Sequence, residues 1–513
     1  MNTMNKTTFL AGAISLCAII AEGTTCIQPQ NVTLQESACQ ESKKDQMKKE
    51  QAHNISNARK IHSLDVDHVL PLAANAQGTK AHYSTTLFVT NPTQRAGFLS
   101  AWAPDAQCGN SFIVQSGETV QIKNVLEQIG CTDPITALYL NNDDMDELQI
   151  VARIDANNNE KGRIGTTIPV LTPEHSVPQS HPFYFFGPMQ KAQTNVSVFS
   201  PYYDATTQIT PIKQGKGYVI WPHPTTSADK VLHLVDFMRD DDTGFITGTP
   251  YEQLTGAGTL GFGFTYLNEI FGLSNMVSES GDSYTDEFYS SKKQRHHAII
   301  PGVTDKITGH GGVYTTTIEL LNPGDNDDMY STVHAIAHLP DGTAHSGEGT
   351  LRAGSSWSMT NLLEQLGVPQ GSYAALELTS SRGFHVHAHT LNEKLIGETN
   401  PVWAFSETIL PAQKGIIASA GQSDVERNNI GIYAPLGANV QLTAYTATGG
   451  VAGEGVVAIT QGAYVQHNLR NIIPNDFSGR LEITSDKPIY AVNFRIDNKT
   501  HDYVVEKAKS IGK

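Results

Sequence analysis

The sequence predicts an all-β protein in which tandem β-sandwich modules follow a signal peptide and a polar linker. Short runs rich in Thr, Val, Tyr and Phe recur between turn residues, and the 513 residues include 44 Gly and 24 Pro. Such a composition favours strands and turns over long helices. Several segments also repeat along the chain with the period-2 alternation of strands. The length exceeds one hydrophobic core, so several domains are expected.

The N-terminus has the layout of a secretory signal peptide over residues 1–23. Lys6 precedes an apolar run from Phe9 to Ile20, and small residues follow that run, as in segments that direct export. No later stretch contains about 18 continuous apolar residues, so we expect no transmembrane segment in the mature chain. These features predict a secreted or periplasmic protein, or one at the cell surface.

Residues 24–66 are polar and charged and contain few aromatic side chains, which predicts a linker. Four cysteines lie outside the signal peptide, namely Cys26, Cys39, Cys108 and Cys131. An even number of cysteines in an exported chain predicts two disulfide bonds. Proximity along the chain favours Cys26–Cys39 and Cys108–Cys131, and other pairings stay open.

The charge balance restricts the class of partner. The formal net charge is −16, from 35 basic and 51 acidic residues. Nucleic acids and anionic membrane surfaces require a cationic face, so the balance argues against both. We therefore expect an extracellular protein or a carbohydrate as ligand.

Repeated segments define the modules. "GETVQIKNVLEQIG" at 117–130 returns as "GSSWSMTNLLEQLG" at 354–367, and the strand "TTLFVTNPT" at 85–93 returns as "TTIELLNPG" at 316–324. Each copy of the segment that contains "LEQ" is followed by two strands with alternating apolar and polar residues and by a polar turn between them. This pattern predicts a hairpin. The predicted modules are 67–165, 166–295, 296–401 and 402–513, and the second is irregular.

This pattern of short strands, Asn-Pro strand ends and one short helical turn resembles the Asn-Pro-containing, immunoglobulin-like β-sandwich repeats of secreted bacterial proteins. The resemblance covers three of the four modules. It implies an immunoglobulin-like sandwich fold and a non-enzymatic role in interactions at the cell surface. It transfers no functional residues to this chain.

The stretch "FHVHAHTLN" at 384–392 places His385, His387 and His389 in strict alternation. Alignment of strand ends sets these histidines opposite apolar residues of the other modules. Their counterparts are Tyr490, Val492 and Phe494 in the last module and Leu148, Ile150 and Ala152 in the first. The histidines are therefore predicted on the core-facing side of the strand.

A second alternating pair, His334 and His338, lies earlier in the same module. If the two strands are neighbours, five imidazoles converge at roughly the 5 Å separation of directly opposed side chains. Imidazole nitrogens suit Zn²⁺ and Cu²⁺, which predicts a metal site that Glu393 or His345 could complete. The alternatives are a row of neutral histidines that hydrogen-bond within the wall of the module, and histidines that face water because this module exposes the other side of the strand.

The irregular second module carries the aromatic residues Tyr184, Tyr218 and Trp221. Such rings have an apolar face and a polar tip, and they are candidates for stacking on sugars. The sequence contains no G-x-S-x-G, Walker or H-E-x-x-H motif. We therefore expect a non-enzymatic surface protein, with a polysaccharide lyase or hydrolase and a metal-binding exported protein as alternatives.

Overall fold

The structure is a computed structural model. The residues it describes are 66–77, 81–103, 108–142, 148–158, 162–172, 175, 182–186, 192–199, 205–212, 225–226, 231–239, 260–265, 271–278, 283–287, 289–290, 295–309, 312–322, 330–353, 355–392, 397–404 and 407–511. The predicted signal peptide and almost all of the predicted linker lie outside these ranges. The described residues all belong to one compact unit, Ala58–Lys513.

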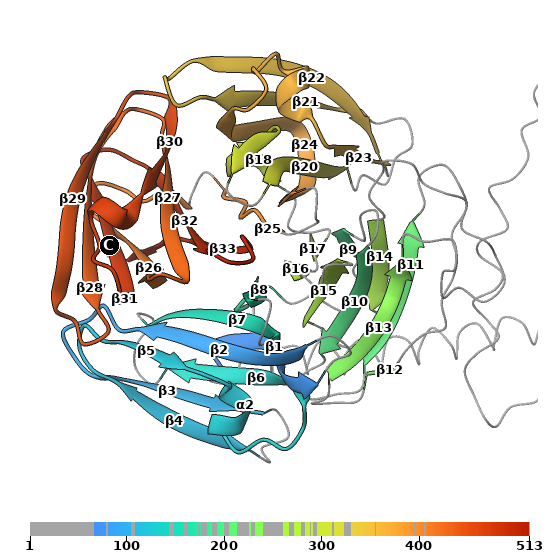
Figure 1. The fold of residues 1–513 in the computed structure, drawn as a ribbon. Coiled ribbons are helices and arrows are strands. Elements are labelled where there is room, and N and C mark those ends of the chain that lie inside the picture. The colour runs from blue at the N-terminus through green and yellow to red at the C-terminus, as the bar shows by residue number, and fades with distance from the viewer. Residues whose placement is uncertain are drawn as a thin grey trace, which may run out of the picture. The chain divides into compact units, whose positions relative to one another are not determined.

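The first copy of the repeated unit is a pair of antiparallel sheets (Figure 1). Its elements are β1 (His68–Gln77), β2 (His82–Thr90), β3 (Gly97–Trp102), β4 (Gly109–Val114), β5 (Thr119–Ile122), α2 (Val125–Gln128), β6 (Ile135–Asn142), β7 (Gln149–Asn158) and β8 (Gly162–Ile168). One sheet has the order β4–β3–β6–β1 and the other β5–β2–β7–β8, and the end of β1 also pairs with β2. Leu87, Leu99 and Leu138 pack in the core between them.

The second copy repeats this strand order, although its sequence is irregular. Its strands are β9 (Pro182–Phe186), β10 (Ala192–Phe199), β11 (Ala205–Ile212), β12 (Thr225–Thr226), β13 (Val231–Arg239), β14 (Leu260–Thr265), β15 (Phe271–Ser278), β16 (Ser283–Glu287) and β17 (Tyr289–Ser290). The sheets run β12–β11–β14–β9–β17 and β13–β10–β15–β16. Strands β9 to β16 thus correspond to β1 to β8.

In the third copy one long strand serves both sheets. The elements are β18 (Arg295–Thr304), β19 (Ile307–Gly309), β20 (Gly312–Asn322), β21 (Tyr330–His338), β22 (Ala344–Arg352), β23 (Ser355–Met359), α3 (Leu362–Gln365), β24 (Tyr373–Asn392) and β25 (Gly397–Thr399). The first part of β24 pairs with β18 and β21, and its second part pairs with β20 and β25. β24 therefore combines the roles of β6 and β7.

The fourth copy has β26 (Lys414–Gln422), β27 (Glu426–Ala434), β28 (Ala438–Thr446), β29 (Val451–Ile459), β30 (Ala463–Asn468), η4 (Leu469–Asn471), β31 (Phe477–Ser485), β32 (Tyr490–Asp497), β33 (Tyr503–Lys507) and β34 (Lys509–Ile511). Its sheets run β29–β28–β31–β26–β34 and β30–β27–β32–β33. The predicted all-β sandwich class is confirmed. As in immunoglobulin domains, the second strand pairs with the fifth and the third with the sixth.

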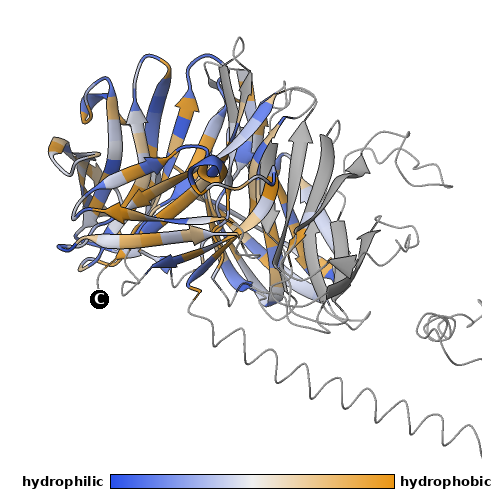
Figure 2. Cartoon of the chain, turned by 90° about the horizontal axis from the view of Figure 1, so that it is seen from below, coloured by the Kyte–Doolittle hydropathy of each residue, from blue (hydrophilic) through white to orange (hydrophobic). Residues whose placement is uncertain are grey.

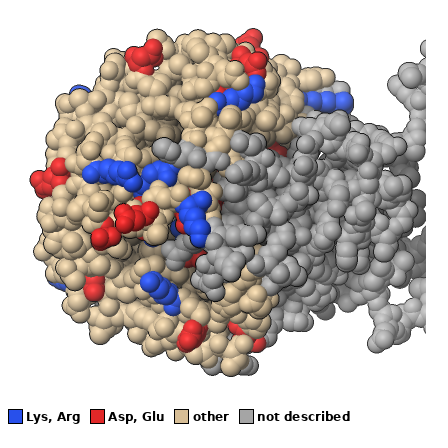
Figure 3. Space-filling view, in the orientation of Figure 1, with Lys and Arg blue, Asp and Glu red and all other residues tan. Residues whose placement is uncertain are grey.

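Hydropathy follows this two-sheet arrangement. Figure 2 shows apolar and polar residues alternating along many strands, as expected where one face of a sheet packs on a core and the other does not. The helices α2, α3 and η4 are only three or four residues long, and no helix in the described ranges could cross a membrane. On the face drawn in Figure 3, acidic and basic side chains are interspersed.

The strands that end three of the copies, β8, β25 and β33, contact one another (Figure 1). Two buried carboxyl groups accept hydrogen bonds across this junction. Glu398 Oε1 accepts from Thr166 Oγ1 at 3.0 Å, and Asp502 Oδ2 accepts from the amide of Gly165 at 2.9 Å. We call Glu398 and Asp502 the junction acids.

Candidate metal centre

Strand register places a glutamate beside the histidine row. Glu319 on β20 lies directly opposite His387 on β24, and Thr317 lies opposite His389. The alternating residues Ile318 and Leu320 pack in the core of the third copy, together with Val386 and Ala388 of β24. Glu319 and the histidines therefore share the other face of the sheet. His385, His387 and His389 are each 1% exposed there.

Glu319, His387 and His389 form a compact donor set. His387 Nδ1 lies 3.2 Å from Glu319 Oε2, and the ring centroids of His387 and His389 are 5.4 Å apart. One potential ligand atom from each residue lies within 4.8 Å of the other two. No other such group of three His, Cys, Asp or Glu residues occurs in the described part of the chain.

The environment disfavours the protonated form of two histidines of the row, His385 and His389. Burial lowers the pKa of His389 well below its ordinary value, and the neighbouring His387 lowers it further. Burial also lowers the pKa of His385 to about 4, with Arg295 acting in the same direction. A metal binds the unprotonated nitrogen, so protons compete weakly for His389.

The donor set fits a transition metal better than a hard cation, because two of its three ligands are imidazoles. Two imidazoles and one carboxylate are also an established set for Zn²⁺, with metal–ligand distances of about 2.0–2.2 Å. Two atoms bound to one ion at those distances are at most about 4.4 Å apart. The ligand atoms of the three residues therefore need to approach one another only slightly for one ion to bind all three.

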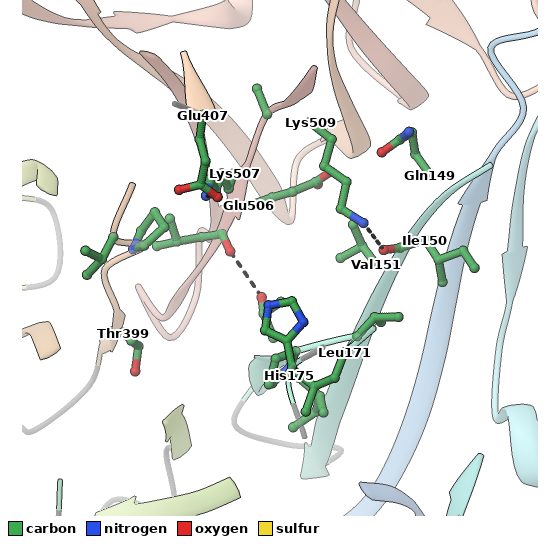
Figure 4. Close-up of a pocket in the computed structure, with 18 of the residues that line it drawn as sticks. Gln149, Ile150, Val151, Leu171, His175, Thr399, Glu407, Glu506, Lys507 and Lys509 are labelled. Atoms are coloured by element: carbon green, nitrogen blue, oxygen red, sulfur yellow. Dashed lines mark hydrogen bonds and ion pairs between the residues drawn. The ribbon is translucent and has the colours of Figure 1, made fainter. Parts of the chain in front are cut away.

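His387 also lines a cavity of about 660 Å³ between strands of the first, third and fourth copies. Figure 4 shows Gln149, His175, Glu407, Lys507 and Lys509 around this space. Lys507 Nζ pairs with Glu407 at 2.5 Å, and Lys509 Nζ donates to the backbone oxygen of Ile150 at 3.4 Å. Charges of both signs line the cavity, and His387 is the residue of the donor set that lines it.

The structure does not bring the five predicted histidines together. β21 pairs with the first part of β24, so His334 lies opposite Thr379 and His338 opposite Ala375. The side chain of His334 is 53% exposed, with Nδ1 3.4 Å from Glu348 Oε2. The expected convergence therefore fails because the histidine row belongs to the second part of β24, which pairs with β20.

His338 has its own partners, far from the donor set in strand register. Its Nε2 lies 3.0 Å from Glu377 Oε2, and its ring centroid is 4.8 Å from that of Tyr433. Hydrogen bonds from His297 and His338 lower the pKa of Glu377 to about 2. His338 thus contacts Glu377 of its own copy and Tyr433 of the fourth copy.

The predicted core-facing orientation of the row also needs correction. The Asn-Pro strands align Glu319 with Phe88, and Phe88 lies opposite Val151. The counterparts of His385, His387 and His389 in the first copy are therefore Gln149, Val151 and Arg153. The predicted counterparts were each one residue away, and a shift of one residue exchanges the two faces of a strand.

In the fourth copy the residues predicted to match the histidine row do match it, but their side chains do not face the core of that copy. Tyr490, Val492 and Phe494 pack with Ile299 and Trp403 in a cluster shared between copies. The core of the fourth copy contains their neighbour Ala491 instead. The row is buried, as predicted, but on the face that lies outside its own sandwich core.

Of the remaining predicted residues, the structure describes some and leaves others outside its described ranges. The Cys108–Cys131 disulfide is present and joins positions 23 residues apart. Tyr184 lies on β9, opposite Phe262. Cys26, Cys39, Tyr218, Trp221 and Glu393 lie outside the described residues, whereas His345 lies on β22 opposite Ala337.

The sequence analysis did not identify Glu319 as a candidate ligand, although the sequence contains a pattern that indicates it. In "TTIELLNPG" the glutamate stands among aliphatic residues of a strand, and the matching position in "TTLFVTNPT" is Phe88. A charged residue at an otherwise apolar position of a repeated strand indicates a buried carboxylate that needs a partner.

Comparisons with known proteins leave the family open. No family model and no curated protein matches the chain. One solved structure matched is a tetra-tandem repeat in the extending region of a large adhesion protein, at 10% identity over 86% of this chain and 98% of that chain, with a TM-score of 0.11. Another is the FN1–FN3 domains of chicken CNTN1, at 9% identity over 65% and 97% of the two chains, with a TM-score of 0.09. Scores this low support no argument about this chain.

Proposed function

We propose that this chain is an exported, non-enzymatic β-sandwich repeat protein of the cell surface, and that its third copy binds a divalent transition-metal ion. Glu319, His387 and His389 are the ligands. The observation that carries the metal proposal is the buried grouping of one carboxylate and two imidazoles within 4.8 Å. Buried ionisable groups of this kind are costly unless an ion or hydrogen bonds compensate them.

Zn²⁺ is the metal that we favour, and Cu²⁺ is the second choice. The backbone supports the site, because Glu319 and His387 lie on paired strands rather than on loops. Export is supported by the signal-peptide pattern at residues 1–23 and by the Cys108–Cys131 disulfide, since disulfides persist in oxidising compartments.

Metal loading of the intact chain tests this proposal. After incubation with Zn²⁺ and dialysis, we expect about one tightly held ion per chain and a higher melting temperature, because a ligand of the folded state stabilises it. Elemental analysis and thermal unfolding measure the two effects. We expect Glu319→Gln and His389→Ala to lower the affinity at least tenfold.

His334→Ala is the matched control, because it removes an exposed histidine of the same copy that lies outside the donor set. This variant should hold Zn²⁺ as the unmodified chain does. A chain that retains no metal and melts at the same temperature with and without Zn²⁺ would contradict the proposal. Equal loss of metal in His334→Ala and His389→Ala would also contradict it.

A further inference from the structure

A second cavity, of about 490 Å³, lies between the third and fourth copies. β18, β19 and β20 form one side, and β27, β30, η4 and β32 form the other. Its volume is in the range of small-molecule sites, which are about 300–1,000 Å³. None of Glu319, His387 and His389 lines it.

The wall of this cavity carries positive charge without a lining carboxylate. Arg427 and Arg470 both line it, and no Asp or Glu occurs among its described lining residues. Asp497, next to the wall, directs Oδ1 to the amides of Lys499 and Thr500 at 2.8 Å each. The two guanidinium groups therefore favour an anion in the space between the copies.

The guanidinium group of Arg427 has few side-chain partners among the described residues. Burial lowers its pKa and the charge of Arg470 acts in the same direction, whereas Tyr314 and Asp497 raise it. The side-chain hydrogen bond of Arg427 among the described residues runs from Nη1 to Asn498 Oδ1. A planar guanidinium retains further N–H groups that can bind a carboxylate through two parallel hydrogen bonds.

The rest of the wall suits a sugar ring with hydroxyl groups. The aromatic rings of Phe494 and Tyr503, each 7% exposed, line the cavity, and Asn429, Gln466 and Asn468 line it with amide groups. Asn429 Oδ1 is buried and has no hydrogen-bond partner among the described residues. Aromatic faces pack against the apolar side of a ring, and amides exchange hydrogen bonds with hydroxyls.

We propose that this cavity binds the carboxylate-bearing sugar of an acidic glycan. Arg427 and Arg470 hold the carboxylate, Asn429 accepts a hydrogen bond from a ring hydroxyl, and Phe494 or Tyr503 packs on the ring. This inference deepens the surface-interaction role proposed above by naming a ligand class. It does not depend on the metal centre, because the two sites share no residue.

Calorimetric titration of the intact chain with glucuronate, glucose and inorganic phosphate tests the inference. We expect glucuronate to bind at least tenfold more tightly than glucose, and its affinity to fall as salt is added. Arg427→Gln should weaken glucuronate binding at least tenfold and leave the weak binding of glucose unchanged. Arg382→Gln, an exposed arginine that does not line the cavity, is the matched control.

Three results would overturn the inference. These are the absence of glucuronate binding, equal affinities for glucuronate and glucose, and equal glucuronate affinities in Arg427→Gln and the unmodified chain. If phosphate bound as tightly as glucuronate, the role assigned to the ring would be wrong. The titration is repeated in the presence of a metal chelator. An unchanged glucuronate affinity there shows that sugar binding does not require the metal centre. Equal melting temperatures of the variants show that each one folds.

Discussion

Replacing Asp502 with asparagine is expected to raise the free energy of unfolding at pH 8 and to reduce its dependence on pH. Burial raises the pKa of Asp502 from an ordinary value of 3.8 to about 8, and the nearby Arg153 only partly opposes this effect. Burial likewise raises the pKa of Glu398 well above its ordinary value, and the charge of Asp502 adds to the increase. The folded protein therefore holds protons at the junction that the unfolded chain has released.

The sign of the effect follows from proton linkage. A carboxyl whose pKa is raised on folding contributes most stability below its unfolded pKa and loses that contribution as pH rises through the folded value. The free energy of unfolding should thus fall with rising pH, by about 1.4 kcal/mol per pH unit for each such group. Asparagine does not titrate, so we expect a gain on the order of 3 kcal/mol at pH 8.

Urea unfolding between pH 6.5 and 8 measures this difference. Below pH 6.5, His385 acts in the opposite direction, because burial lowers its pKa to about 4 and the unfolded chain then binds the extra proton. Asp424→Asn, at an exposed position, is the control and should leave the pH dependence unchanged. A pH slope in Asp502→Asn as steep as that of the unmodified chain would show that Asp502 is ionised in the fold.

Loss of the Cys108–Cys131 disulfide is expected to cost about 3 kcal/mol of stability. The bond closes a loop of 23 residues that contains β5 and α2, and closing such a loop removes conformational entropy from the unfolded chain. Both cysteines also pack against the core of the first copy. Replacing both with serine should therefore lower the urea midpoint of this copy.

The experiment uses a background in which Cys26 and Cys39 are serine, so that reduction affects one bond alone. Dithiothreitol should destabilise that background protein and have no effect on the variant that also lacks Cys108 and Cys131. Identical unfolding midpoints of the oxidised and reduced background protein would contradict the expectation.

Local pattern was enough to predict the fold class. Alternating residues in segments 135–155 and 479–498 predict two strands in each, which match β6 and β7 and then β31 and β32, and the repeated "LEQ" turns match α2 and α3. The predicted pairing of these strands as hairpins is wrong, because β6 and β31 each lie in one sheet of their copy and β7 and β32 lie in the other. The Cys108–Cys131 disulfide could also be predicted from the sequence, because the two cysteines are close together along the chain.

The sites depend on register and on distant segments, which a single sequence encodes weakly. A displacement by one residue in the alignment of Val151 with His387 reversed the predicted face of the histidine row. β24 is one continuous strand, so β21 and the histidines pair with different parts of it. The residues that line the cavity around Arg427 come from segments between Gly302 and Tyr503, and no local sequence pattern predicts this cavity.

The junction acids have a consequence for how the chain reaches its folded state. Thr166 and Glu398 are 232 residues apart, and Gly165 and Asp502 are 337 residues apart. Contacts at such separations form slowly, because a long loop must close before they contribute. During synthesis, the first copy cannot complete its buried hydrogen bonds until Asp502 has left the ribosome. We expect the emerging chain to remain incompletely docked, and open to chaperones, until its last strands have been made.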